Sequence, residues 1–121
     1  MFEIQAESIF SAAHHLLNYE GKCEHQHGHN WKVVVAVRGE KLDKSNILVD
    51  FKALKRELNR VLDLIDHNDL NELEYFGGES PSSEMIAKFI FDEMAKTFDC
   101  MYFSAVWETP TSCAKYYRTE K

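Results

Sequence analysis

The sequence predicts an α+β fold in which a four-stranded antiparallel sheet carries two helices on one face. Segments near both ends of the chain alternate apolar and polar residues, as strands do. The middle of the chain repeats apolar residues at steps of three and four, which is typical of amphipathic helices. The resulting order is strand, strand, helix, helix, strand, strand. A chain of 121 residues has the size of one domain, so we expect a single domain over residues 1–121.

The first two predicted strands enclose a polar segment rich in histidine. Residues 2–13 place mostly apolar side chains on one side and glutamate or glutamine on the other, which indicates a strand. Residues 31–38 are dense in valine, which indicates a second strand. The segment 21–28 runs directly into this strand, so its histidines enter the sheet.

Two helices are predicted between the strands. Asp50 can cap a helix over residues 50–65, where apolar residues form a single stripe. Residues 64–78 are polar and irregular. We expect a second helix to begin at Ser80–Pro81, with serine as the N-cap and proline at the first helical position, and to end near Phe98.

The end of the chain is predicted to form a β-hairpin. Residues 101–108 and 113–118 are rich in aromatic and β-branched side chains, and Pro110 and Ser112 lie between them. These strands complete a sheet whose helices cover one face. Because residues 33–37 are apolar on both sides of their strand, the other face also needs a cover, and we expect the chain to oligomerise.

Composition and charge exclude several classes of partner. The net charge is −6 and the basic residues are scattered, so no direct nucleic-acid partner is expected. No apolar run approaches the roughly 18 residues of a membrane span, and the first residues are acidic where a signal peptide would be basic. We therefore expect no membrane partner and a cytoplasmic location. Three cysteines, Cys23, Cys100 and Cys113, cannot all pair within one chain, which favours free thiols.

The histidines indicate a metal site. Five of the six lie between His14 and His29. His25, His27 and His29 share parity, so in an extended segment successive rings leave the same face about 6.5 to 7 Å apart, and two of them can grip one ion. His14 or His15, at the end of the first strand, can supply a third ring. Three imidazoles leave the fourth position of a zinc ion open, as in catalytic sites.

Spacing alone leaves the ligand set open among these five histidines. It also leaves open an alternative function of a different class. Cys23 could complete a closed site with three histidines, and the chain would then be a structural zinc module without catalytic activity.

Eight short motifs follow one another along nearly the whole chain: Phe10-Ser11-Ala12-Ala13-His14, Lys22-Cys23, His27-Gly28-His29, Val49-Asp50-Phe51, Asp66-His67, Leu70-Asn71, Pro81-Ser82-Ser83-Glu84 and Glu108-Thr109. Together they resemble the 6-pyruvoyl-tetrahydropterin synthase superfamily, and most closely its compact bacterial branch that produces 6-carboxy-tetrahydropterin. The resemblance implies the tunnelling fold (T-fold), in which neighbouring subunits join their sheets into a barrel. It also implies a homo-oligomer, commonly a hexamer of two trimers, with active sites between neighbours.

The resemblance implies a role for each candidate residue. The zinc ligands would be His14, His27 and His29. The substrate would be 7,8-dihydroneopterin triphosphate, whose tail hydroxyls zinc polarises. The catalytic residues would be the general base Cys23 and the acid–base pair Asp66 and His67. The substrate-binding residues would be Glu108, which fixes the pterin ring, and Thr109, Ser82, Ser83 and Glu84, which line the pocket.

The resemblance leaves three chemistries for the substrate tail. We favour a lyase reaction that yields 6-carboxy-5,6,7,8-tetrahydropterin, acetaldehyde and triphosphate for queuosine precursor synthesis, because the chain is compact. A second branch eliminates triphosphate to give 6-pyruvoyl-tetrahydropterin. A third uses a glutamate three residues before His-Gly-His for a folate-directed, aldolase-like cleavage, and Glu24 stands at that position beside Cys23.

Overall fold

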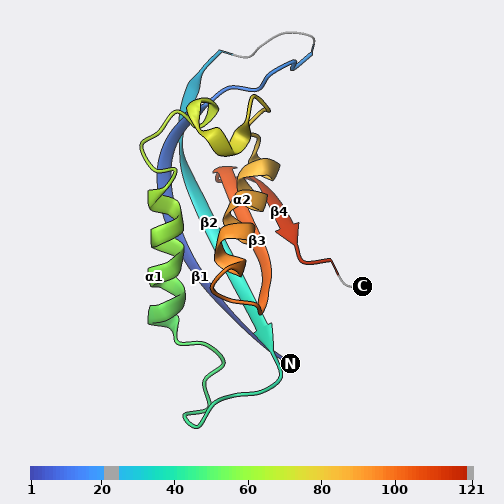
Figure 1. Ribbon diagram of the computed structural model, residues 1–121. Helices are drawn as coiled ribbons and strands as arrows, with labels where there is room; N and C mark the ends of the chain where they lie inside the picture. Colours follow the sequence, from blue (N-terminus) through green and yellow to red (C-terminus); the bar gives the residue numbers. More distant parts are fainter. Residues whose placement is uncertain (21–24, 120–121) are drawn as a thin grey trace.

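The computed structural model describes residues 1–20 and 25–119 and has the predicted α+β architecture (Figure 1). The strands and helices are β1 Phe2–His14, β2 His27–Gly39, α1 Phe51–Asp63, α2 Ser83–Ala95, β3 Met101–Thr109 and β4 Ser112–Tyr117. Two 3-10 helices, η1 Leu70–Glu72 and η2 Glu74–Phe76, lie in the stretch predicted to be irregular. The sheet order is β1-β2-β3-β4, and each neighbouring pair is antiparallel, as expected.

The main core lies between the sheet and the two helices, which lie along the same side of it (Figure 1). It joins alternate residues of β1 and β2 to the apolar stripes of α1 and α2. Trp31, Val33 and Val35 of β2 are fully buried there, as are Leu54 and Leu58 of α1. Burial of one such side chain contributes roughly 1.5 to 3 kcal/mol. These contacts therefore hold the helices on the sheet.

The opposite face of the sheet carries a second, smaller apolar cluster. It consists of Val34, Ala36, Phe103 and Ala105. Tyr102 and Trp107 pack beside it, with the guanidinium of Arg38 3.5 Å from the centre of the Tyr102 ring and Lys32 over Trp107. Aromatic and cationic side chains of the same chain thus border the face for which the sequence provides no helical cover.

Helix α2 begins later than predicted. The N-cap is Ser82, whose hydroxyl accepts the N–H of Met85 at 3.2 Å, and not Ser80. The Ser80 hydroxyl instead accepts the N–H of Leu17 at 2.6 Å and donates to the carbonyl of Leu17 at 3.2 Å. Pro81 therefore lies outside the helix, because a tertiary contact uses the serine that the local pattern assigned to the cap.

Helix α1 begins as predicted. The Asp50 carboxylate accepts the N–H of Lys52 at 2.8 Å and so caps the helix, which ends at Asp63. In the described part of the chain, neither helix is long and apolar enough to cross a membrane.

Candidate active site

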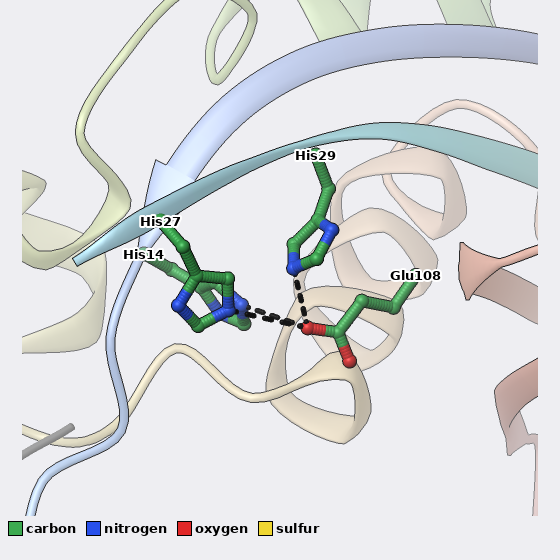
Figure 2. A group of neighbouring side chains, drawn as sticks. All are labelled: His14, His27, His29 and Glu108. Carbon is green, nitrogen blue, oxygen red and sulfur yellow. Dashed lines mark hydrogen bonds and ion pairs between the residues drawn. The ribbon is translucent and has the colours of Figure 1, made fainter. Parts of the chain in front are cut away.

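Three histidines meet at one end of the helix-covered face of the sheet (Figure 2). His14 ends β1 and His27 begins β2, and the antiparallel register pairs them, while His29 pairs with Ala12. Because side chains alternate along a strand, all three rings leave the same face as Trp31. Their ring centroids lie 4.7 to 5.5 Å apart. The sheet register thus brings together the three histidines that were expected to act as ligands.

The carboxylate of Glu108 reaches the same point from β3 (Figure 2). Its Oε1 lies 3.0 Å from Nε2 of His14, 3.6 Å from Nε2 of His27 and 2.9 Å from Nε2 of His29. Four side chains, and not only the three expected histidines, therefore converge.

A β-bulge accompanies this arrangement. Trp107 pairs with Cys113 and Thr109 pairs with Ser112, which are adjacent in β4. Glu108, between Trp107 and Thr109, therefore has no partner in β4. Bulges of this kind redirect a side chain and are frequent beside active sites. Val106 and Glu108 are two residues apart, so strand alternation places both on the helix-covered face, where the histidines lie.

Backbone carbonyls determine which nitrogens face the centre of the cluster. Nδ1 of His14 lies 2.8 Å from the Pro81 carbonyl oxygen, and Nδ1 of His27 lies 2.9 Å from the carbonyl oxygen of His25. A carbonyl oxygen only accepts, so both Nδ1 atoms donate a proton, and in the neutral rings the lone pairs are on Nε2. Metal-ligating histidines commonly have such a carbonyl partner.

His29 presents a buried nitrogen to the same centre. Its Nε2 makes no hydrogen bond among the described residues, because the 2.9 Å approach of Glu108 is poorly directed for one. Burial lowers the pKa of the His29 imidazole, Glu108 opposes this shift, and His27 and His14 reinforce it. The lowered pKa favours the neutral ring, which is the form that binds metals.

The four side chains form a donor set that could hold a metal ion. One ligand atom from each lies within 4.8 Å of the others. Two ligands at ~2.1 Å from a zinc ion and at the tetrahedral angle are about 3.4 Å apart. The distances from Glu108 to the three nitrogens, 2.9 to 3.6 Å, lie on both sides of that value. Imidazole and carboxylate suit zinc and other first-row divalent ions, so the residues fit such a cofactor.

A hollow of about 390 Å³ adjoins the cluster and shares Glu108 with it. Its other lining residues are Ser83, Glu84, Ser112, Cys113, Ala114 and Lys115. Two residues expected to bind substrate, Ser83 and Glu84, therefore lie beside Glu108, while Ser82 caps α2. Cys113 is a free thiol, as expected, and is exposed in this hollow. Thr109 lines a different hollow together with Asn30, Lys32, Trp107 and Pro110.

The pair Asp66 and His67 lies outside the cluster, along the outer edge of β1. Oδ1 of Asp66 accepts the backbone N–H of Ser11 at 2.8 Å and lies 3.0 Å from Nδ1 of His67. The hydrogen bond from Ser11 holds the pKa of the Asp66 carboxyl below its usual value. The His67 side chain is 82% exposed. Asp66 and His67 are thus in contact with each other but are not among the four converging side chains, although His67 lines a hollow together with His29.

Cys23 and Glu24, which distinguish the possible chemistries, lie outside the described residues.

The segment that follows His14 is nevertheless firmly held. The side chain of Asn71 bonds both the N–H and the carbonyl of His15, at 2.9 and 3.0 Å, and Ser80 does the same for Leu17.

The sequence analysis did not identify Asn71 and Ser80 as residues that hold this segment. It also did not identify Trp31 as a residue that packs against the histidines. Its ring lies edge to face with His14 and His29, at centroid distances of 4.9 and 5.3 Å. The motif Leu70-Asn71 was the only signal for Asn71, and Trp31 had none beyond its place in a buried strand.

Comparison with known proteins shows the family to which the chain is similar. The family model for 6-pyruvoyl tetrahydropterin synthase matches residues 3–119. A Synechocystis protein named 6-carboxy-5,6,7,8-tetrahydropterin synthase is 36% identical, over 97% of this chain and 94% of its own. A Bacillus subtilis protein of the same name is 33% identical, over 95% of this chain and 84% of its own.

A solved structure shares the fold. The 6-pyruvoyl tetrahydropterin synthase of Caenorhabditis elegans superposes with a TM-score of 0.84 at 27% identity, and the match covers 98% of this chain and 96% of that one. The family match includes all four strands, both helices and the four converging side chains. The chain therefore belongs to the 6-pyruvoyl tetrahydropterin synthase family.

Proposed function

We propose that the chain is a zinc-dependent lyase that converts 7,8-dihydroneopterin triphosphate to 6-carboxy-5,6,7,8-tetrahydropterin, acetaldehyde and triphosphate. The observation that carries this proposal is the cluster of three histidines and Glu108 beside an open hollow. The names of the Synechocystis and Bacillus relatives support the 6-carboxy product. In this proposal the enzyme works in the cytoplasm and supplies the queuosine precursor.

His14, His27 and His29 would hold the zinc ion. When bound, zinc supplies Lewis acidity, which stabilises negative charge that develops on oxygens of the substrate tail. The carbonyls of Pro81 and His25 keep two of the rings in the tautomer that such binding needs.

The remaining residues would bind the ring and move protons. The Glu108 carboxylate accepts hydrogen bonds from the amino group and ring N–H of the pterin, which positions the tail at the histidines. Cys23 is the proposed base. Asp66 keeps the His67 ring oriented through their 3.0 Å contact, so that His67 can exchange protons with the substrate or the thiol.

A second copy of the chain would supply the acid–base pair. Asp66 and His67 are separated from the cluster within one chain, yet His67 is exposed at the edge of the sheet. An oligomer in which the sheets join into a T-fold barrel, such as a hexamer of two trimers, would bring a neighbour's edge close to each cluster.

The direct test is to incubate the purified, zinc-loaded protein with 7,8-dihydroneopterin triphosphate. Every pterin product is identified by mass, and acetaldehyde is assayed separately. We expect 6-carboxy-tetrahydropterin and acetaldehyde in equal amounts. An unchanged substrate, with the zinc retained, would exclude this activity and favour the structural zinc module.

A second candidate is formation of 6-pyruvoyl-tetrahydropterin, which the name of the Caenorhabditis elegans neighbour favours. The same assay separates the two, because the 6-pyruvoyl product forms without acetaldehyde. The product 6-hydroxymethyl-dihydropterin would instead indicate the cleavage assigned to Glu24. Cys23→Ala adds a check on the base: we expect the variant to keep its zinc and oligomeric state and to lose turnover.

A further inference from the structure

Glu108 belongs to two environments at once. One carboxylate oxygen contacts the three Nε2 atoms, while the other points away from the histidines (Figure 2). The same side chain lines the adjoining hollow, and it is 32% exposed. Glu108 is thus the one residue, among those described, that belongs to both the cluster and this hollow.

The contact between Glu108 and the histidines needs a positive charge. In the neutral rings of His14 and His27, the lone pairs of Nε2 face the carboxylate oxygen, because Nδ1 of each ring donates to a carbonyl. These lone pairs, opposed at 3.0 and 3.6 Å, repel one another unless a proton on Nε2 or a metal cation lies between them. A divalent ion among the four side chains would replace this repulsion by attraction to each donor atom.

We propose that Glu108 is a displaceable fourth ligand of the metal centre. It closes the centre when no substrate is bound, and it leaves the histidines for the hollow when the substrate enters. The inference builds on the proposed function, because it adds a second task for the carboxylate that would bind the pterin ring. One side chain then couples recognition of the ring to the opening of the metal centre.

This coupling makes the ring a requirement for access to the metal. A molecule that offers the carboxylate N–H donors draws Glu108 off the centre, and its tail takes the freed position. A small diol without a ring has no such donors and meets a closed centre. Glu108 is therefore a specificity-determining residue as well as a binding residue.

The experiment uses the purified protein with cobalt in place of zinc, because the visible absorption of Co²⁺ reports the number and kind of its ligands. Glu108→Gln is compared with Glu84→Gln, which removes one negative charge from the same hollow without touching the histidines. We expect Glu108→Gln to change the cobalt spectrum and to weaken zinc binding, measured by competition with a chelator, by roughly tenfold or more. Glu84→Gln should change neither.

The second arm adds ligands to the wild-type cobalt protein. We expect 7,8-dihydroneopterin, which carries ring and tail, to change the spectrum, and glycerol at the same concentration to leave it unchanged. If Glu108→Gln has the wild-type spectrum and zinc affinity, or if glycerol acts like dihydroneopterin, the proposal is wrong. Thermal unfolding checks that the variants are folded, and Glu108→Asp, which shortens the side chain, replaces Glu108→Gln if that variant does not fold.

The outcomes also separate this inference from the proposed function. Turnover with an unchanged Glu108→Gln spectrum would reject the fourth ligand and keep the enzyme. A changed spectrum without turnover of 7,8-dihydroneopterin triphosphate by the wild type would keep the fourth ligand and reject the reaction.

Discussion

At the scale of single residues, the cluster depends on side chains whose partners are backbone atoms. The rings of His14 and His27 are each oriented by one carbonyl, and Asp66 is held by the N–H of Ser11. Backbone partners are set by the fold, so they persist when neighbouring side chains change. The orientation of the site therefore depends on the backbone at Pro81 and His25, beside the strands, and at Ser11 within β1.

The first prediction at this scale concerns His29. Removing its ring in His29→Ala takes one nitrogen from the centre, and we expect zinc affinity to fall by roughly a hundredfold or more. The matched control is His25→Ala, because His25 is exposed and only its carbonyl supports the cluster. Zinc content after dialysis and chelator competition measure both. A His29→Ala variant that keeps one ion per chain would contradict the ligand assignment.

The second concerns the pH dependence of stability at Asp66. Its folded-state pKa lies below the usual 3.8, so the unfolded chain binds the proton more tightly. The ionised carboxylate contributes its full stabilisation when the pH is well above the unfolded-state pKa. This contribution is lost as the pH falls through the folded-state pKa. We expect Asp66→Asn to lower the unfolding free energy at pH 7 by at most about 1 kcal/mol, since the side chain is partly exposed. Urea unfolding should show the difference shrinking as the pH falls below 3.8, and a constant difference would refute the charge effect.

At the scale of elements, the sequence predicts what depends on local pattern. The valines of β2 and the stripe of α1 follow from side-chain periodicity, and Asp50 caps α1 as expected. The start of α2 could not be predicted, because Ser80 and Ser82 are equivalent as local caps until Leu17 binds Ser80. The position of Glu108 on the histidines, 94 residues from His14, depends on the pairing of β3 with β2, which no local pattern reveals.

The N-cap of α2 provides the third prediction. Ser82→Ala removes the oxygen that accepts the N–H of Met85, and we expect a loss of about 1 kcal/mol in unfolding free energy. Ser83→Ala, one residue into the helix, removes a hydroxyl that makes no capping bond and should cost much less. Denaturant unfolding of the two variants gives the comparison, and equal losses would show that the cap contributes nothing specific.

At the scale of the whole molecule, one chain carries only part of the proposed machinery. The metal cluster lies at one end of the helix-covered face, while Asp66 and His67 lie along the outer edge of β1. The second apolar cluster, around Val34 and Phe103, lies on the face without helices. These features are consistent with an assembly in which edges and faces of several copies meet.

The fourth prediction tests whether neighbouring copies share a site. His29→Ala and His67→Ala should each be inactive, because one lacks a ligand and the other lacks the proton carrier. When the two are unfolded and refolded together in equal amounts, about a quarter of the sites would combine an intact cluster with an intact neighbouring pair, so activity should return to about a quarter of the wild-type value. Each variant refolded alone is the control. A mixture that stays inactive would place both groups in the same chain.

The position of Glu108 in β3 also determines which insertions and deletions the chain can tolerate during evolution. Side-chain direction reverses with each residue along a regular strand, so deleting one residue between Phe103 and Trp107, where the pairing with β2 is regular, would turn Glu108 away from the histidines. Residues added at Pro110 and Thr111 leave that count unchanged, because they lie in the turn beyond it. Insertions and deletions among descendants of this sequence should therefore accumulate in the turn, and the spacing within β3 should be inherited unaltered.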